Sequence, residues 1–413
     1  MYNHNHKKNI ENVLILQGGG SLGAFACGVF KGFALKNIKF DIISGTSIGA
    51  INGAIAAGSK NNNPAQDLED FWMEIAESSV NVIPDIFSID YNSQTLQLNL
   101  KNSSSASLNA AIFGIPKFFV PRWFNYNFMD KDKNSHDSNI LTLPNHWTYI
   151  YDNSPLQKTL EKYIDFKKLS PDIKLKKDNT NSTNNNDTEN AGNTGNTGKN
   201  TGTPRLVITA VDVLSGQPII FDSYRKQIEM KHLLATIGYP QYGFPWVNVD
   251  GDVYAWDGSL LSNTPVREVM VASPSNDKNI FIIENYPKKI ENLPNNRIEV
   301  QSRAKDIMFT DKDQSLRKMS KLITRQINLI EKLYDIFNET DHSKIDKNLI
   351  DFIEKEHKVL VEKFGAKILK IYRISRENSK TPHSTQNAEF SVNIIKQLIK
   401  QGEDKALECL KEE

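Results

Sequence analysis

Short apolar runs alternate with helically spaced segments in the first part of the chain. Residues 13–16 form a compact apolar run that ends in three glycines, which indicates a buried strand followed by a turn. In the segment 21–35 the apolar residues recur every three or four positions, as in an amphipathic helix. A second apolar run at 40–44 precedes a small-residue helix at 48–57. This alternation predicts a largely parallel sheet covered by helices on both faces.

Further elements are predicted in the second half of the chain. Two strands are expected at 205–213 and 218–221, joined by a turn at Ser215-Gly216. A helix is expected at 319–337, where apolar residues keep a spacing of three or four. The remaining predictions are a strand at 280–284, a helix at 349–364, a strand at 366–374 and a helix at 391–410.

Two segments stand apart in composition. Residues 177–203 contain no aromatic and almost no aliphatic side chain, so they cannot bury enough surface to offset their ordering entropy, and we expect a disordered surface loop. The stretch 112–124 is aromatic, carries two prolines and is flanked by Lys117 and Arg122. Its apolar face either meets a lipid surface or packs in the core. The same alternatives hold for the 319–337 helix, where core packing is favoured.

Composition and charge exclude several classes of protein. The 413 residues suggest two to three domains, and the 39% of apolar residues suffice for a core. Lys and Arg number 50 against 49 Asp and Glu, so nothing indicates a nucleic-acid partner. The two cysteines lie at opposite ends of the chain and there is no His-x-x-x-His, so neither a disulfide scaffold nor a metal site is expected. No signal peptide or membrane-spanning segment is recognisable, and we expect a cytoplasmic protein.

A G-x-S-x-G motif, Gly45-Thr46-Ser47-Ile48-Gly49, lies between a predicted strand and a predicted helix. A nucleophilic serine on a sharp strand-to-helix turn needs small residues two positions away on either side. The backbone can then fold tightly, and the hydroxyl projects into a cleft. The helix that follows also offers free N–H groups at its start. The alternative is an ordinary helix start without chemistry.

A second glycine-rich turn, Gly18-Gly19-Gly20-Ser21-Leu22-Gly23, also joins a strand to a helix. It lacks the Lys-Ser/Thr of a phosphate loop, but its glycines fit a dinucleotide-binding pattern loosely, with Asp41 as the expected acidic residue. Alternatively, its backbone N–H groups form an oxyanion hole, or the glycines make only a turn. The serine motif one strand later favours the oxyanion hole, because acyl transfer needs both parts.

The third candidate is Asp257-Gly258-Ser259, after a predicted strand. An Asp-Gly pair is most often a plain turn, but next to a nucleophilic serine the carboxylate could act as its base. None of the eight histidines is adjacent to the three motifs. A Ser…Asp…His triad could still use His342, His357 or His383, but these lie in the polar helical tail. The sequence therefore favours a Ser–Asp pair.

Three segments in this order resemble the patatin-like phospholipase family, in its prokaryotic branch. They are QGGGSLGAFACGVFKGF, FDIISGTSIGAINGAIAAG and YAWDGSLLSNTPVREVM. The resemblance extends over about residues 12–308, interrupted by the low-complexity loop. It implies an α/β three-layer sandwich with a central, mostly parallel sheet. We expect a polar tail at 1–11, a hydrolase domain at 12–310 with the disordered insertion at 177–203, and a mainly helical extension at 311–413.

The resemblance assigns the nucleophile to Ser47 and the base to Asp257, without a histidine. It implies an oxyanion hole formed by the N–H groups of Gly18, Gly19, Gly20 and Ile48, supported by Ser21, Gly23, Gly45, Gly49, Gly258 and Ser259. The implied activity is hydrolysis of carboxylic esters of lipids, phospholipids included, through an acyl-enzyme. No metal or organic cofactor is implied.

Other functions remain open at this stage. The same pair would serve on an intracellular hydroxyalkanoate polyester or a thioester, and a catalytically silent scaffold that binds lipid or protein is an alternative of another class. A nucleotide-binding oxidoreductase is a more distant one. The sequence departs from the family in Ser259, where Gly or Ala is usual, and in Tyr239 and Tyr242, which enter the expected wall of the site. The substrate partner is expected to be a lipid or another acyl ester, with contact to a membrane surface.

Overall fold

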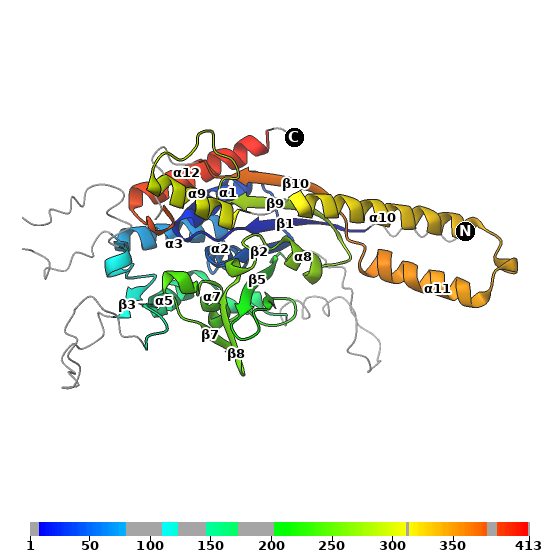
Figure 1. Ribbon diagram of the computed structural model, residues 1–413, viewed down its shortest axis with the longest axis horizontal. Coiled ribbons are helices and arrows are strands. Elements are labelled where there is room, and N and C mark those ends of the chain that lie inside the picture. Colours follow the sequence, from blue (N-terminus) through cyan, green and yellow to red (C-terminus); the bar gives the residue numbers. More distant parts are fainter. Residues whose placement is uncertain are drawn as a thin grey trace, which may run out of the picture.

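The computed structural model describes residues 8–79, 110–122, 146–171, 202–310, 314–377 and 386–411. A central sheet runs through the molecule, with helices packed against it (Figure 1). Most of the predicted loop at 177–203 and part of the aromatic stretch, Trp123 and Phe124, lie outside the described residues.

The sheet is mixed but mostly parallel, as the sequence predicts. Within the described part of the chain it has eight strands, in the order β10-β9-β1-β2-β5-β8-β7, with β6 paired to β5. Strands from β10 to β5 run parallel, whereas β6 and β8 are antiparallel to β5, and β7 is antiparallel to β8. A separate two-stranded ribbon pairs β3 with β4. The strands are β1 (Ile10–Leu16), β2 (Ile42–Thr46), β3 (Val120–Pro121), β4 (Tyr151–Asp152), β5 (Arg205–Asp212), β6 (Pro218–Asp222), β7 (Val247–Asp250), β8 (Val253–Asp257), β9 (Asp277–Glu284) and β10 (Ile368–Ser375).

Alternate residues of the central strands enter different cores. In β1, Leu14 and Leu16 face a large cluster with helices α1, α2, α3 and α12, whereas Val13 and Ile15 face a smaller cluster with α8. This period of two places apolar residues on both faces of the sheet, which explains the continuous apolar runs of the sequence. The helices are α1 (Ala24–Leu35), α2 (Ile48–Ala57), α3 (Pro64–Ser78), α5 (Ser154–Tyr163), α7 (Met230–Thr236), α8 (Val266–Ala272), α9 (Arg297–Phe309), α10 (Gln314–Glu339), α11 (Lys347–His357) and α12 (Val392–Cys409).

The C-terminal region contributes to the main body of the fold. β10 extends the sheet beside β9, and α12 packs on α1. The two helices approach closely because small residues face each other: a Cβ on Gly28 would lie 1.8 Å from the carbonyl oxygen of Ile399, and one on Gly402 would lie 2.1 Å from that of Phe25. Part of the predicted extension at 311–413 therefore belongs to the core of the sheet domain.

By contrast, α10 and α11 project away from the sheet (Figure 1). α10 is amphipathic, as predicted, but among its described side chains Ile327 is buried, whereas Leu322, Leu329, Leu333 and Ile336 are between 49% and 61% exposed. The core packing favoured from sequence is therefore wrong for these four leucine and isoleucine side chains. The period of the pattern predicts a helix correctly, but it does not say whether the apolar face meets another element.

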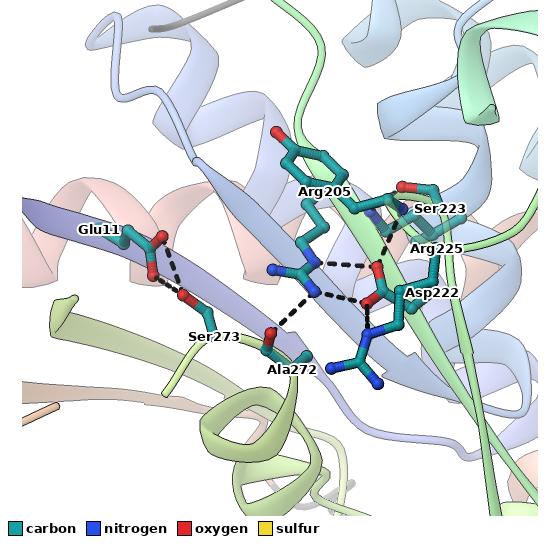
Figure 2. Close-up of polar contacts among 9 residues, drawn as sticks. Glu11, Arg205, Asp222, Ser223, Arg225, Ala272 and Ser273 are labelled. Atoms are coloured by element: carbon teal, nitrogen blue, oxygen red, sulfur yellow. Dashed lines mark hydrogen bonds and ion pairs between the residues drawn. The ribbon is translucent and has the colours of Figure 1, made fainter. Parts of the chain in front are cut away.

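Ion pairs connect the first residues of β1 and β5 to neighbouring segments. Figure 2 shows Arg205, at the start of β5, between the carboxylate of Asp222 and the carbonyl of Ala272, to which it donates at 2.8 Å. Glu11 on β1 accepts hydrogen bonds from Ser273 and pairs with the fully buried Lys278 at 3.0 Å. These pairs satisfy the buried charges at one edge of the sheet. The candidate site lies at the opposite end of the sheet, at the carboxyl ends of the parallel strands.

Candidate active site

Ser47 occupies a strained turn between β2 and α2. Its φ of 56° and ψ of −131° lie in a region that residues with a side chain seldom adopt, at a cost of roughly 1–3 kcal/mol. Gly45 and Gly49 make the turn possible: a Cβ on Gly45 would lie 2.4 Å from the backbone of Gly49, and one on Gly49 would lie 2.2 Å from the carbonyl oxygen of Leu16. The half-buried Ser47 thus sits on the tight strand-to-helix turn that the G-x-S-x-G pattern predicts.

The register of the sheet brings Asp257 to the level of Ser47. Thr46, which precedes the serine, lies opposite Thr209 on β5, and the next residue of β5, Ala210, lies opposite Asp257 at the end of β8. The Asp257 side chain is 1% exposed. Burial raises the pKa of this carboxyl to about 6, against the opposing effect of hydrogen bonds from Ser259 and from the Ser47 side chain. A buried carboxylate therefore interacts with the serine hydroxyl.

The glycine turn lies beside Ser47 at the end of β1. A Cβ on Gly18 would lie 2.9 Å from the Ser47 Cβ, and Gly18, Gly19 and Gly20 line the same cavity as the serine. The N–H of Gly18 donates to Oδ1 of Asn263 at 2.9 Å, so it is already engaged. The remaining candidates for an oxyanion hole are therefore Gly19, Gly20 and the first N–H groups of α2, which have no acceptor within the helix.

Several polar side chains that the sequence analysis did not single out hold this turn in place. Asn263 accepts from Gly18 and donates to the carbonyl of Phe309 at 3.0 Å. Asn285 donates to the carbonyls of Gln17 and Gly18, at 3.0 and 3.1 Å. These asparagines stand after β8 and β9, so only the fold brings them to the glycine turn. Asn263 lies six residues after Asp257, and nothing in the local sequence pattern distinguishes it from other polar residues.

The three motifs open into one cavity of about 480 Å³. Ser47, Asp257 and Ser259 lie on its wall together with the glycine turn, and most of the remaining lining is apolar or aromatic. The aromatic stretch supplies Phe118 and Phe119, which are both 7% exposed, so this part of it lines the site and the core. Its lipid-surface alternative is not supported for these two residues. The other aromatic lining residues are Tyr151, Tyr239, Tyr242, Phe244, Tyr286, Phe309 and Phe390.

Three of the four described histidines stack on aromatic rings outside the cavity. His232 accepts from the N–H of Glu229 and stacks on Phe221, and burial lowers its pKa to about 4. His342 stacks on Phe337, and His357 stacks on Tyr334. Neither these three nor His146 lines the cavity. In the part of the chain that the structure describes, no group of His, Cys, Asp and Glu has the arrangement of a metal site.

A family model for patatin-like phospholipases matches residues 14–270, which is more than half of the chain. This chain belongs to the patatin-like phospholipase family. The resemblance seen in the motifs is thereby confirmed, and the match includes Ser47, Asp257 and the glycine turn. Patatin-like phospholipases are a family of lipid acyl hydrolases. Lys305, Phe309 and Asn387 line the same cavity from outside the matched residues.

The solved structures to which this patatin-like chain is similar include one from a bacterium. The crystal structure of VipD from Legionella pneumophila is similar over 98% of this chain and 67% of that chain, at 13% sequence identity and a TM-score of 0.36. No curated protein matches the chain. Of the helices within the described ranges, none has the length and apolar character needed to cross a membrane.

Proposed function

We propose that this chain is a serine acyl hydrolase that cleaves carboxylic esters of lipids, phospholipids included, through an acyl-enzyme on Ser47. One observation carries the proposal: a serine on a strained turn shares a largely apolar cavity with a buried carboxylate that interacts with its hydroxyl. Such a pair supplies a nucleophile and a base, which is the minimum for covalent ester hydrolysis.

In the first half of the reaction, Asp257 accepts the hydroxyl proton of Ser47 while the serine oxygen attacks the ester carbonyl carbon. The carbonyl oxygen becomes an anion, which the N–H groups of Gly19, Gly20 and Ile48 stabilise. The bond to the alcohol then breaks, and Asp257 returns the proton to the leaving alkoxide. The fatty acyl group remains as an ester on Ser47.

In the second half, water replaces the alcohol. Asp257 takes a proton from the water, whose oxygen attacks the acyl carbonyl, and the same N–H groups stabilise the second oxyanion. The bond to Ser47 breaks, and the serine oxygen recovers the proton from Asp257. A base with a pKa of about 6 suits both steps, because it is ionised at neutral pH yet still accepts a proton readily. No resident metal or organic cofactor enters this scheme.

The apolar wall of the cavity suits a fatty acyl chain. Phe118, Phe119 and Phe244 lie together there, with ring centroids 5.3 to 5.8 Å apart along the series. Apolar burial in such a wall contributes about 0.8 kcal/mol for each methylene group that leaves water. The acyl group of a lipid is therefore favoured over a polar acid as the group transferred to Ser47.

Hydrolysis of a soluble acyl ester tests this function. We expect wild-type protein to release p-nitrophenol from an acyl p-nitrophenyl ester, and Ser47→Ala to lower the rate at least about 100-fold. Ser215→Ala, in the exposed β5–β6 turn, is the matched control and should keep the wild-type rate. Wild-type activity in Ser47→Ala would refute the mechanism. A catalytically silent scaffold would be indicated if folded wild-type protein hydrolysed none of four substrates: this ester, lipid esters, a hydroxyalkanoate polyester and a thioester.

We also propose that α10 brings the enzyme to an anionic membrane surface. Its exposed apolar side chains, Leu329 and Leu333 among them, are accompanied by the exposed basic residues Lys321, Arg325 and Lys332. An apolar stripe flanked by basic residues is typical of helices that lie in a membrane interface. Such contact would deliver lipid substrates to a chain in which none of the described helices can span the bilayer.

A further inference from the structure

Lys305 brings a cationic side chain to the cavity that contains Ser47 and Asp257. It lies on α9, four residues before Phe309, and both side chains line the cavity. Residues four apart share one helix face, so the same face of α9 supplies an apolar ring and an ammonium group. Neither residue belongs to the range that matches the family model.

Two neutral side chains adjoin the Lys305 ammonium. Nζ is 3.5 Å from Oδ1 of Asn387 and 5.3 Å from the centroid of the Tyr242 ring. Asn387 also forms a side-chain hydrogen bond with Tyr242, so the three side chains make one polar cluster in a mostly aromatic wall. Burial lowers the pKa of Lys305, because the ammonium loses part of its hydration. An anion that enters the cavity would stabilise the charged ammonium in place of the lost water.

The cluster borders the glycine turn directly. A Cβ on Gly20 would lie 2.2 Å from the carbonyl oxygen of Asn387, and Ser21 donates to the carbonyl of Gln386 at 2.9 Å. The segment that positions Asn387 therefore packs on the turn expected to bind the ester oxygen. In a glycerophospholipid, only a few covalent bonds separate the ester carbonyl from the phosphate. A substrate with its carbonyl at the glycine turn would carry its phosphate close to Lys305.

We propose that Lys305 determines substrate specificity by binding the phosphate of a glycerophospholipid whose ester lies at Ser47. The inference rests on the proposed function and deepens it, because it selects phosphorylated lipids over neutral acylglycerols. An ammonium binds phosphate as a compact charge with up to three hydrogen bonds. Asn387 and Tyr242 orient the ammonium. Ligand-binding cavities are typically lined by apolar side chains, with a few polar groups that orient the ligand.

A pair of substrates that differ only in the phosphate tests the inference. 1-Decanoyl lysophosphatidic acid and 1-decanoylglycerol, both below their aggregation concentrations, share the acyl chain, the glycerol and the ester. We expect Lys305→Met to lower kcat/KM for the phosphorylated substrate at least about tenfold, which is the lower range for a charged hydrogen bond, and to change the neutral one less than about threefold. Lys305→Arg should retain the preference, and Lys36→Met, at the exposed end of α1, should leave both values unchanged. The inference would be overturned if Lys305→Met kept the wild-type ratio of the two kcat/KM values, whether both values fell equally or neither changed.

A binding measurement separates this inference from the proposed hydrolysis. Decyl phosphate and decanol are titrated by calorimetry into Ser47→Ala and into the double variant Ser47→Ala/Lys305→Met. We expect the second substitution to weaken decyl phosphate at least about tenfold and decanol less than about threefold. Equal affinity of the two proteins for decyl phosphate would overturn the role of Lys305 even in an active enzyme. If the wild type lacked esterase activity but the two variants still differed in their affinity for decyl phosphate, the proposed hydrolysis would be refuted and the phosphate site would be supported.

Discussion

The backbone N–H and the hydroxyl of Ser259 both donate to Oδ1 of Asp257, at 2.8 Å each. The third residue of the Asp-Gly-Ser turn is small enough to keep the turn, and its hydroxyl adds a hydrogen bond that Gly or Ala could not supply. Both bonds stabilise the ionised carboxylate and so oppose the burial that raises its pKa. Ser259 therefore lowers the pKa of Asp257, the carboxyl that we propose as the base for Ser47.

The first prediction concerns the pH dependence of catalysis. The kcat/KM of the wild type should fall as the pH drops through about 6, because Asp257 becomes protonated and can no longer accept the Ser47 proton. Ser259→Ala removes one hydrogen bond to the ionised form, so the midpoint of this acidic limb should rise by up to about one pH unit. The measurement is a pH–rate profile on a soluble acyl ester.

Ser215→Ala, on the exposed turn, controls for the loss of a hydroxyl as such and should keep the wild-type midpoint. An acidic limb with the same midpoint in Ser259→Ala as in the wild type would contradict the assignment of Asp257 as the base that Ser259 adjusts.

The second prediction is that Asp257→Asn stabilises the fold at neutral pH. The raised pKa of Asp257 means that the folded state holds this proton where the unfolded state has released it, between about pH 4 and 6. The free energy of unfolding therefore decreases as the pH rises through this window. Asparagine avoids the buried charge, so the variant should exceed the wild type by up to about 3 kcal/mol at pH 8 and by little at pH 4.

Urea denaturation of both proteins at the two pH values measures this difference. A wild type that is the more stable protein at pH 8, or a gap that is the same at both pH values, would show that the Asp257 charge is not the destabilising group. Stabilisation with loss of activity is the expected pattern for a residue kept for catalysis.

Much of the site follows from sequence because its geometry is local. Glycines on either side of Ser47 are needed for one tight turn, and a strand followed by three glycines marks the other turn. The helix 48–57 is predicted with the bounds that the structure gives it. The Asp-Gly pair is ambiguous alone, and only its combination with the two turns predicts that Asp257 is the base.

The parts that sequence patterns did not reveal depend on contacts between distant segments. Asn263, Asn285 and Lys305 carry no local signature, and they reach the site because β8, β9 and α9 end beside it. α12 shows a helical period, but its docking on α1 depends on small residues that face each other across the interface. Of the β7–β8 hairpin, the sequence predicts the strand before Asp257 but not β7.

The third prediction tests Asn263 as a positioning residue for the glycine turn. Asn263→Ala leaves the Gly18 N–H and the Phe309 carbonyl without these hydrogen bonds, at roughly 1–3 kcal/mol for each buried group. We expect stability to fall by that order and kcat to fall at least about tenfold, with a smaller change in KM.

Asn263→Asp separates the two bonds, since it can still accept from Gly18 but cannot donate to Phe309. It should retain more of kcat than Asn263→Ala does. Equal kcat in Asn263→Ala and the wild type would show that the glycine turn keeps its catalytic geometry without this side chain.

The fourth prediction concerns the exposed face of α10. Wild-type protein should co-sediment with vesicles that contain phosphatidylglycerol and much less with vesicles of phosphatidylcholine alone, because basic residues accompany the apolar stripe. Leu329→Glu/Leu333→Glu should abolish binding while hydrolysis of a soluble ester stays at the wild-type rate. Unchanged vesicle binding in this variant would exclude the α10 face as the membrane contact.

The most direct test of the central claim, that Ser47 is a nucleophile activated by Asp257, is labelling with a fluorophosphonate followed by mass spectrometry of the labelled peptide. The account predicts a single adduct on Ser47 of the wild type, none on Ser47→Ala, and labelling of Asp257→Asn slowed at least about 100-fold. An adduct on another serine, or labelling of Asp257→Asn at the wild-type rate, would contradict it.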